Sequence, residues 1–232
     1  MRYFAKQTRQ FIEMSSPRIF YIHDPMCSWC YAFSQSWTAL LKELPQDIEI
    51  IYLVGGLAPD TNEPMPLATQ KMVQQAWQRI EQTVPGVHFN WDFWSRNTPI
   101  RSTYPACRAV LAAKKQRAES EVEMIRAIQT AYYQQAKNPS LAETLHACAH
   151  EIGLDVSTFI EDLKSPMIGS ELQQQIQQAR SMDVYSYPSL RLMHNNTVFP
   201  IAIDYLDYRA MLNEIKSIES VVAHNGSDGF RN

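Results

Sequence analysis

The chain has 232 residues, of which 45% are hydrophobic and 19% are charged, and its formal net charge is -3. The composition is typical of a globular protein, and the length suffices for one large domain or for one domain with a sizeable insertion. Because phosphate groups are bound by clustered Lys and Arg, the slight negative charge argues against nucleic acid as a partner. No apolar run approaches the roughly 18 residues that span a bilayer, so no membrane partner is expected.

The two ends of the chain carry no recognisable motif. Residues 1–13 contain two Arg, one Lys and three aromatic residues, but no continuous apolar segment of the kind found in secretory signals. We therefore expect a cytoplasmic protein in which residues 1–13 and 223–232 are flexible termini.

The first predicted strand and helix meet at residues 24–33, DPMCSWCYAF. Before this segment, residues 18–23 form a β-branched and aromatic run that is typical of a buried strand. After it, apolar residues recur at helical spacing up to Pro45: Phe33, Trp37, Leu40, Leu41 and Leu44. The sequence therefore predicts a strand, a short turn and then a helix that begins near Cys27.

Cys27 and Cys30 are separated by two residues at the predicted start of this helix. The unpaired backbone N-H groups and the positive end of the helix dipole favour a thiolate at Cys27, and Cys30 follows one turn later, close enough to form a disulfide. In a reducing compartment such a pair is more often catalytic or metal-binding than structural. We therefore predict a redox site in which Cys27 is the exposed nucleophile.

A zinc site is the alternative use of this cysteine pair, but zinc needs four ligands. The segment that offers further ligands is residues 146–150, HACAH. On a helix, His146 and His150 share a face and Cys148 points away from it, so we expect no metal. Cys148 and Cys107 lie among apolar residues with helical spacing and are expected in the core; an auxiliary thiol pair is the alternative.

A second strand and then a helical region follow. Residues 48–54 are nearly all apolar and end at two Gly residues, which predicts a central strand and completes a right-handed βαβ unit. Residues 91–96, WDFWSR, predict a short helix with Trp91 and Trp94 packed inward.

The remaining helices are predicted from apolar spacing and from capping signals. They cover residues 73–84, 104–117, 120–136, 140–153, 155–163 and 165–182. Two of them begin with a capping box and two with a single cap: Ser120 with Glu123, Ser140 with Glu143, Asp155, and Ser165.

Strands return near the end of the chain. The segments predicted to be extended are residues 184–185, 189–193 and 197–201, with a hairpin turn at Asn195-Asn196. Asp204 is the predicted cap of a last helix that ends near residue 222. Because a lone hairpin is marginally stable, we expect it to join the N-terminal strands in one sheet. Residues 14–59 and 183–222 would then form one domain, and residues 60–182 an inserted helical domain.

The order of these elements, with DPMCSWCY before the first helix and Tyr187-Pro188-Ser189 before the hairpin, resembles the DsbA-type family of thioredoxin-fold proteins. The cysteine motif is similar to that of the cytoplasmic FrnE-like branch. The resemblance implies an α/β thioredoxin fold with a large all-helical insertion, and a cis peptide bond at Pro188 that lies against the cysteine pair. An ordinary trans proline before an edge strand is the alternative.

Two features depart from the family pattern. Many thioredoxin-like proteins place a buried carboxylate six residues before the first Cys, where this chain has Tyr21. His23 and Asp24 are candidate substitutes, although each also suits the strand end or the turn. The dipeptide between the cysteines, Ser28-Trp29, is neither the Gly-Pro of thioredoxin nor the Pro-His of the periplasmic oxidant, so the redox potential cannot be copied from either.

The motif and the resemblance together predict a thiol-disulfide oxidoreductase or disulfide isomerase that acts through Cys27, Cys30 and Pro188. Its expected substrates are disulfides of proteins, peptides or small thiols, paired in extended conformation with the backbone of Tyr187. The residues predicted to flank the site are Ser28, Trp29 and Tyr31. No bound cofactor is expected, and glutathione is a candidate co-substrate.

Two other functions fit the same resemblance. One is a glutathione-dependent isomerase or transferase of the kappa type, although that branch commonly has a non-thiol residue at the first Cys position. The other is a non-catalytic peptide-binding module that uses the groove beside Pro188.

Overall fold

The computed structural model describes residues 16–228 of the chain. Its strands are β1 (Arg18–His23), β2 (Glu49–Val54), β3 (Ser189–His194) and β4 (Thr197–Ile201). Helix α1 (Ser28–Glu43) joins β1 to β2, and α9 (Tyr208–Asp228) follows β4. The elements between β2 and β3 are α2 (Leu67–Thr83), α3 (Phe93–Arg96), α4 (Tyr104–Gln116), α5 (Ser120–Gln129), the π-helix η1 (Thr130–Gln134), α6 (Ala142–Glu151), α7 (Val156–Leu163) and α8 (Pro166–Ser181).

The four strands form one sheet in the order β2-β1-β3-β4. Strand β1 is parallel to β2 and antiparallel to β3, and β3 is antiparallel to β4. Ile22 therefore lies between Leu53 of β2 and Ser189 of β3. The N-terminal βαβ unit and the C-terminal hairpin share one sheet, as predicted.

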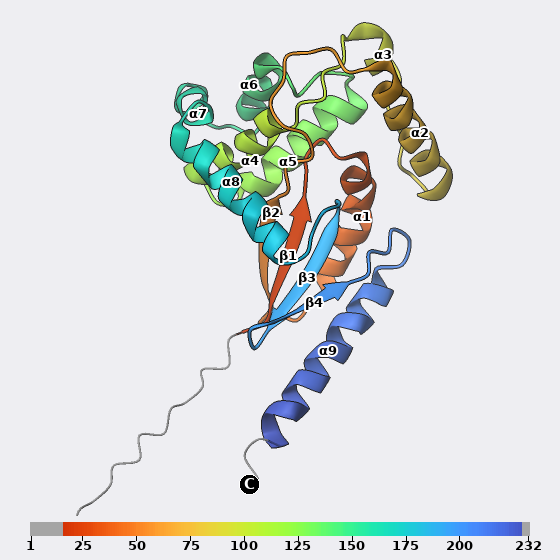
Figure 1. The fold of residues 1–232 in the computed structure, drawn as a ribbon, viewed down its shortest axis with the longest axis vertical. Coiled ribbons are helices and arrows are strands. Elements are labelled where there is room, and N and C mark those ends of the chain that lie inside the picture. Colours follow the sequence, from red (N-terminus) through yellow and green to blue (C-terminus); the bar gives the residue numbers. More distant parts are fainter. Residues whose placement is uncertain (1–15, 229–232) are drawn as a thin grey trace, which may run out of the picture.

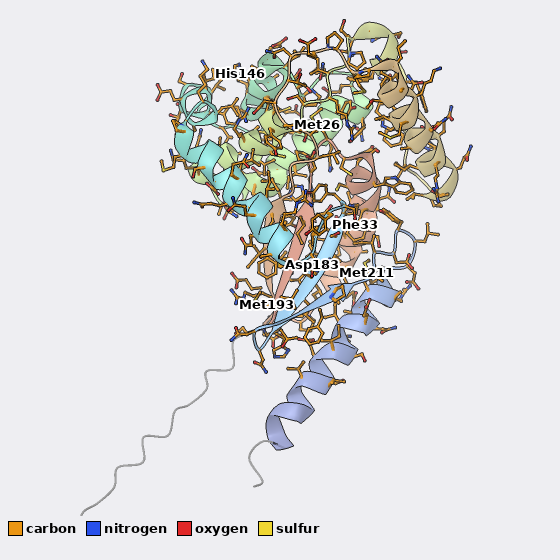
Figure 2. The ribbon with its side chains drawn as sticks, in the orientation of Figure 1. Met26, Phe33, His146, Asp183, Met193 and Met211 are labelled. Carbon is orange, nitrogen blue, oxygen red and sulfur yellow. The ribbon has the colours of Figure 1, made fainter. Side chains whose placement is uncertain are left out.

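Each face of the sheet buries a separate apolar layer. Helices α1 and α9 cover one face, where Phe33 and Met211 are buried together with Ile19. Helix α8 covers the other face and packs Ala179 against Phe20. Figure 1 shows α8 on the opposite side of the sheet from α1, and Figure 2 shows Phe33 and Met211 on the side of α1 and α9.

The other helices gather beyond the end of the sheet at which β1 finishes (Figure 1). Their core is aromatic: Trp77 is completely buried, and its ring stacks on Phe89 with centroids 4.6 Å apart. Met26, from the turn that follows β1, packs into this same core (Figure 2). The turn before the cysteine pair is therefore held between the sheet and the helices.

Both predicted capping boxes are wrong, because each serine has another partner. Ser120 is already inside α5; its hydroxyl accepts from Arg117 Nε at 2.9 Å and donates to the Glu123 carboxylate at 3.4 Å, so it caps no backbone N-H. The Ser140 hydroxyl donates to the carbonyl of Ser102 at 2.8 Å, and α6 begins only after Leu141. The two single caps are confirmed: Asp155 accepts from the Thr158 N-H, and Ser165 accepts from the Met167 N-H.

Other element boundaries also differ from the predictions, and α2 begins at Leu67 rather than near residue 73. The helix predicted to reach residue 136 changes into the π-helix η1 and ends before Ala136, whose φ is +56°. Residues 184–185 are not a strand: the Arg180 guanidinium lies 4.7 Å above the ring of Tyr185, whose side chain faces solvent. The carboxylate of Asp204 accepts N-H groups of the turn before α9, and α9 runs to Asp228 rather than to 222.

The short helix α3 also packs differently from the prediction. Phe93 is its buried residue, whereas Trp91 lies before the helix and is 36% exposed. Trp91 donates its indole N-H to Glu81 at 3.2 Å, and this polar contact keeps the ring at the surface. Trp94 is half-buried against the helical core, as predicted.

Other predictions concern single residues and the termini. Cys107 and Cys148 are buried, as expected of core cysteines. Within residues 16–228 there is no group of His, Cys, Asp and Glu that is arranged to hold a metal ion. In the same part of the chain, no helix combines the length and the apolar character needed to span a bilayer. Residues 1–13 and 229–232, predicted to be flexible, lie outside the described residues.

The aromatic core predicts a large difference between two tryptophan variants. Trp77→Ala should lower the free energy of unfolding by about 3–5 kcal/mol, because it leaves a cavity in a fully packed site. Trp91→Ala removes a ring that is 36% exposed and meets Trp77 edge-on, so it should cost less, about 1–2 kcal/mol. Equilibrium urea unfolding followed by circular dichroism measures both, and equal losses would contradict this account of the core.

Candidate functional site

Cys27 and Cys30 lie where β1 turns into α1. Cys27 occupies the N-cap position of α1, and its N-H donates to the carbonyl of Asp24 at 3.0 Å to close the turn. Cys30 is in the first turn of the helix. Both are free thiols, with exposed fractions of 7% for Cys27 and 1% for Cys30. The expectation of an exposed Cys27 is therefore wrong, because the thiol turns inward toward the loop that precedes β3.

That loop contains a cis peptide bond between Tyr187 and Pro188, as the resemblance implied. The Cys27 thiol donates to the carbonyl of Tyr187, with an Sγ to O distance of 3.4 Å. The Tyr187 hydroxyl donates to the carbonyl of Gly55 at 2.5 Å. A Cβ at Gly55 would lie only 2.0 Å from the Tyr187 ring, so glycine is required for this close approach. The end of β2 thus fixes the cis-proline loop beside Cys27.

The surroundings of Cys30 are mostly neutral and aromatic. Burial raises the pKa of the Cys30 thiol well above its ordinary value, and the neighbouring Cys27 raises it further. Tyr21 is also buried, and burial together with the nearby Cys30 raises the pKa of its phenol well above 10. Tyr21, Cys30 and Tyr52 share the wall of a cavity of about 210 Å³. Cys30 therefore holds its proton strongly and faces a phenol that stays protonated.

Asp24 is a completely buried carboxyl group with four hydrogen-bond donors. Its oxygens accept from Met26 N at 2.8 Å, Leu57 N at 2.7 Å, Thr103 Oγ1 at 2.6 Å and Cys107 Sγ at 3.5 Å. Burial raises the pKa of Asp24, and these donors oppose the shift. The carboxyl group therefore joins the turn, the end of β2 and the start of α4, which is a structural role at the strand end.

His23 is also completely buried, next to the rings of Tyr21 and Tyr52 at centroid distances of 5.2 and 6.1 Å. Neither of its ring nitrogens has a hydrogen-bond partner among the described residues. Burial lowers the pKa of His23 from 6.5 to about 3. The imidazole is therefore neutral at physiological pH and is a weak base.

The three residues predicted to flank the site surround the cysteine pair and are half-buried. Ser28 and Trp29 lie between the two cysteines, and the Trp29 ring packs against Tyr205 with centroids 5.0 Å apart. Tyr31 stacks on Tyr133 with centroids 4.6 Å apart. Trp29 and Tyr205 also line a surface pocket of about 350 Å³.

Tyr133 and Tyr205 also lie near the site, although no sequence motif predicts them. The charge of a Cys27 or Cys30 thiolate would further raise the pKa of both phenols, after burial as the main cause, which indicates that both lie near the two thiols. Tyr133 comes from the π-helix η1 and Tyr205 from the segment before α9. No spacing rule connects these segments to residues 27–30, so only the folded chain brings them together.

Comparison with known proteins identifies the family. The sequence model of the thioredoxin family matches residues 20–208, most of the chain. The chain belongs to the thioredoxin family. Its helices between β2 and β3 and its four-stranded mixed sheet give this thioredoxin-family protein a DsbA-like fold, as the sequence motif implied.

Two solved structures share the fold of this thioredoxin-family protein. A proposed protein disulfide isomerase from Nitrosomonas europaea is 23% identical, with a TM-score of 0.77, and the match covers 88% of this chain and 97% of that one. The cytosolic disulfide reductase DsbM from Pseudomonas aeruginosa is 22% identical, with a TM-score of 0.70, and the match covers 87% of this chain and 99% of that one.

A curated relative of this thioredoxin-family protein is named as an adapter, not as an oxidoreductase. The ClpXP adapter protein SpxH of Halalkalibacterium halodurans is 27% identical over 177 residues, which are 75% of this chain. The match spans only 57% of the length of that relative.

The buried His23 predicts a pH dependence of stability. Its pKa is lowered in the folded state, so between pH 6.5 and about 3 the unfolded chain binds a proton that the folded chain does not. The free energy of unfolding should therefore fall as the pH is lowered through this window, by about 1.4 kcal/mol per pH unit from this residue. His23→Phe keeps a planar ring but cannot bind a proton, so this contribution to the pH dependence of the free energy of unfolding should be absent. Urea unfolding at pH values on both sides of 6.5 measures it.

The same substitution at the exposed His150 is the control, and it should leave the slope unchanged. A slope that is equal in wild type and His23→Phe would contradict a neutral, buried His23.

Proposed function

We propose that this protein is a thiol-disulfide oxidoreductase that exchanges disulfides with protein, peptide or small-molecule thiols. The observation that carries the proposal is the contact between Cys27 Sγ and the Tyr187 carbonyl, 3.4 Å apart, with Cys30 one turn behind. A substrate strand that pairs with the backbone at Tyr187 would bring its disulfide to the same thiol. The helix start at Cys27 favours the thiolate that such an attack requires.

The reaction consists of two exchanges. The Cys27 thiolate attacks one sulfur of the substrate disulfide; a Cys27-substrate disulfide forms, and the other substrate sulfur leaves as a thiolate. Cys30 then loses its proton and attacks Cys27 Sγ, so that the Cys27-Cys30 disulfide forms and the second substrate sulfur leaves. Two electrons pass from the cysteine pair to the substrate, and in reverse the protein donates a disulfide.

We further propose a cytoplasmic reductase or isomerase that small thiols keep reduced. In a reducing cytoplasm, glutathione and thioredoxin maintain such cysteine pairs as dithiols. Glutathione is the candidate co-substrate, and the solved structure of DsbM with glutathione, 22% identical and with a TM-score of 0.68, is consistent with this choice. No other cofactor enters the proposal.

A second candidate function is that of a protein adapter, as the name of the curated relative suggests. An adapter binds a partner protein and needs no thiol chemistry. A non-catalytic peptide-binding module would likewise need none. In that case the cysteines would be dispensable for function. An isomerase of the kappa type would instead turn over in the absence of Cys30.

Cysteine variants separate these functions. Reduction of insulin disulfides by a small thiol should be accelerated by the wild type, and Cys27→Ser should return the rate to that of the protein-free reaction, because the nucleophile is lost. Cys30→Ser should accumulate a mixed disulfide on Cys27, which mass spectrometry of the intact protein detects. Cys148→Ala is the matched control, because this buried thiol lies in α6, outside the site. The activity of this variant should equal that of the wild type.

Insulin reduction by Cys27→Ser at the wild-type rate would refute the proposed function. Binding of a partner protein that persists in Cys27→Ser, without any insulin reduction by the wild type, would support the adapter.

A further inference from the structure

The second exchange requires that the buried Cys30 thiol gives up its proton. Cys30 must lose its proton before it attacks Cys27, yet its side chain is only 1% exposed and burial raises the pKa of its thiol. The position six residues before Cys27 holds Tyr21, not a carboxylate. Asp24 is committed to four donors, and the imidazole of His23 is a weak base. None of these side chains is suited to take the proton.

A cavity lies behind Cys30, and much of its wall is apolar: Trp37, Leu41, Val122 and Ile125. Its volume is about 210 Å³, and its wall includes hydroxyl, amide and guanidinium groups: Tyr21, Ser34, Thr38, Tyr52, Arg126 and Gln129. The Trp37 indole donates to the Tyr52 hydroxyl at 3.0 Å, so the Tyr52 proton is left for another acceptor. A cavity of this size holds several water molecules, each of which occupies about 30 Å³ in the liquid, and its wall offers the partners that ordered water needs.

A surface groove adjoins the cavity. A groove of about 510 Å³ between α1 and the α5-η1 segment shares four wall residues with it: Ser34, Thr38, Arg126 and Gln129. The outer groove is also lined by Gln35 and Lys42, which are exposed. The cavity behind the Cys30 thiol therefore lies next to a groove that is open to solvent, on the side of α1 that faces α5.

Two exposed cations lie beside the cavity and the groove. Arg126 lines both the cavity and the groove, Lys42 lines the groove, and no acidic side chain lines either of them. Neither cation forms an ion pair with any other described residue. No acidic side chain in either wall therefore competes with water for the proton of Cys30.

Other titratable groups surround Cys30. On β1 and its turn these are Tyr21, His23 and Asp24; on β2, Tyr52; on α5 and η1, Glu121, Arg126 and Tyr133; and elsewhere, Cys27 and Tyr205. Glu121 acts on Tyr52, but it is paired with Lys114 at 2.9 Å. The four phenols are neutral donors.

We propose that the cavity behind Cys30 is the proton exit of the resolving step, and that the Tyr21 hydroxyl donates a hydrogen bond to the Cys30 thiolate as it forms. This inference rests on the proposed oxidoreductase function. The Cys30 S-H bond breaks and its proton passes to water in the cavity and out between α1 and α5. The Cys30 Sγ to Cys27 Sγ bond forms, and the bond from Cys27 to the substrate sulfur breaks, with the electron pair leaving on the substrate thiolate.

The resolving step can be timed by itself with 5,5′-dithiobis(2-nitrobenzoate). Attack by Cys27 releases one thionitrobenzoate and leaves the other as a mixed disulfide, and attack by Cys30 releases the second. Stopped-flow absorbance gives both rates. Their dependence on pH reports the proton affinity of each thiol.

Two variants test the two parts of the proposal. Tyr21→Phe removes only the hydroxyl and should raise the pH midpoint of the second release by about one unit, which slows this step about tenfold below the midpoint. Thr38→Leu places an apolar side chain in the shared opening and should slow the second release relative to the first across the pH range. Thr38→Ser, which keeps the hydroxyl, and Thr158→Leu, on the exposed surface of α7, are controls that should behave as the wild type.

An unchanged pH midpoint in Tyr21→Phe would overturn the role of Tyr21. An unchanged ratio of the two rates in Thr38→Leu would overturn the exit through the cavity, and Gln129→Leu at the same opening tests that route again should the first variant fail to fold. A wild type that never releases the second thionitrobenzoate would instead refute the proposed function, so the two failures are distinguishable.

Discussion

The buried carboxyl group of Asp24 is the contact on which the rest of the site depends. Removing such a group from water is costly unless hydrogen bonds replace the water, and here four donors do so. The donors come from the turn before Cys27, from Leu57 after β2, and from Thr103 and Cys107 at the start of α4. One side chain therefore fixes the cysteine turn relative to both the sheet and the helices.

The same arrangement fixes the other wall of the site. Leu57 follows the two glycines at the end of β2, and the ring of Tyr187 packs directly on Gly55 and donates to its carbonyl. The cis-proline loop is thereby positioned from the segment that Asp24 anchors. The contact between Cys27 and the Tyr187 carbonyl is a consequence of these packed and hydrogen-bonded neighbours, so a change at Asp24 would disturb both walls at once.

The two cysteines experience opposite influences. Cys27 lies at the N-terminus of α1, where unpaired N-H groups stabilise negative charge. Cys30 is one turn deeper, among phenols and beside a neutral imidazole, where burial raises the pKa of its thiol. A carboxylate in the position of Tyr21 would act as a base, whereas a buried phenol acts only as a donor. Proton loss from Cys30 therefore depends on access to water, and this gives the cavity behind Cys30 its importance.

The sequence predicts those features that depend on local pattern, and it misses those that depend on distant partners. The strands are found because their apolar runs are short and bounded by turns, and the cysteine turn and the cis proline follow from a motif. Ser120 and Ser140 look like helix caps locally, but Arg117 and the Ser102 carbonyl are better partners in the folded chain. The inward orientation of the Cys27 thiol, and the approach of Tyr133 and Tyr205, are likewise decided by tertiary packing.

The fold alone does not distinguish an oxidoreductase from an adapter, because one fold supports both kinds of function. The distinction lies in features that only one of them needs. A surface that binds a partner protein needs no thiol at a helix start, and it gains nothing from a cavity behind a second buried thiol. A cavity within the protein forfeits packing contacts and so lowers stability, and the hydroxyl and amide groups in its wall need water as a partner. Such a cavity is accounted for if Cys30 must exchange a proton with solvent, and this need arises only when Cys30 attacks a disulfide on Cys27.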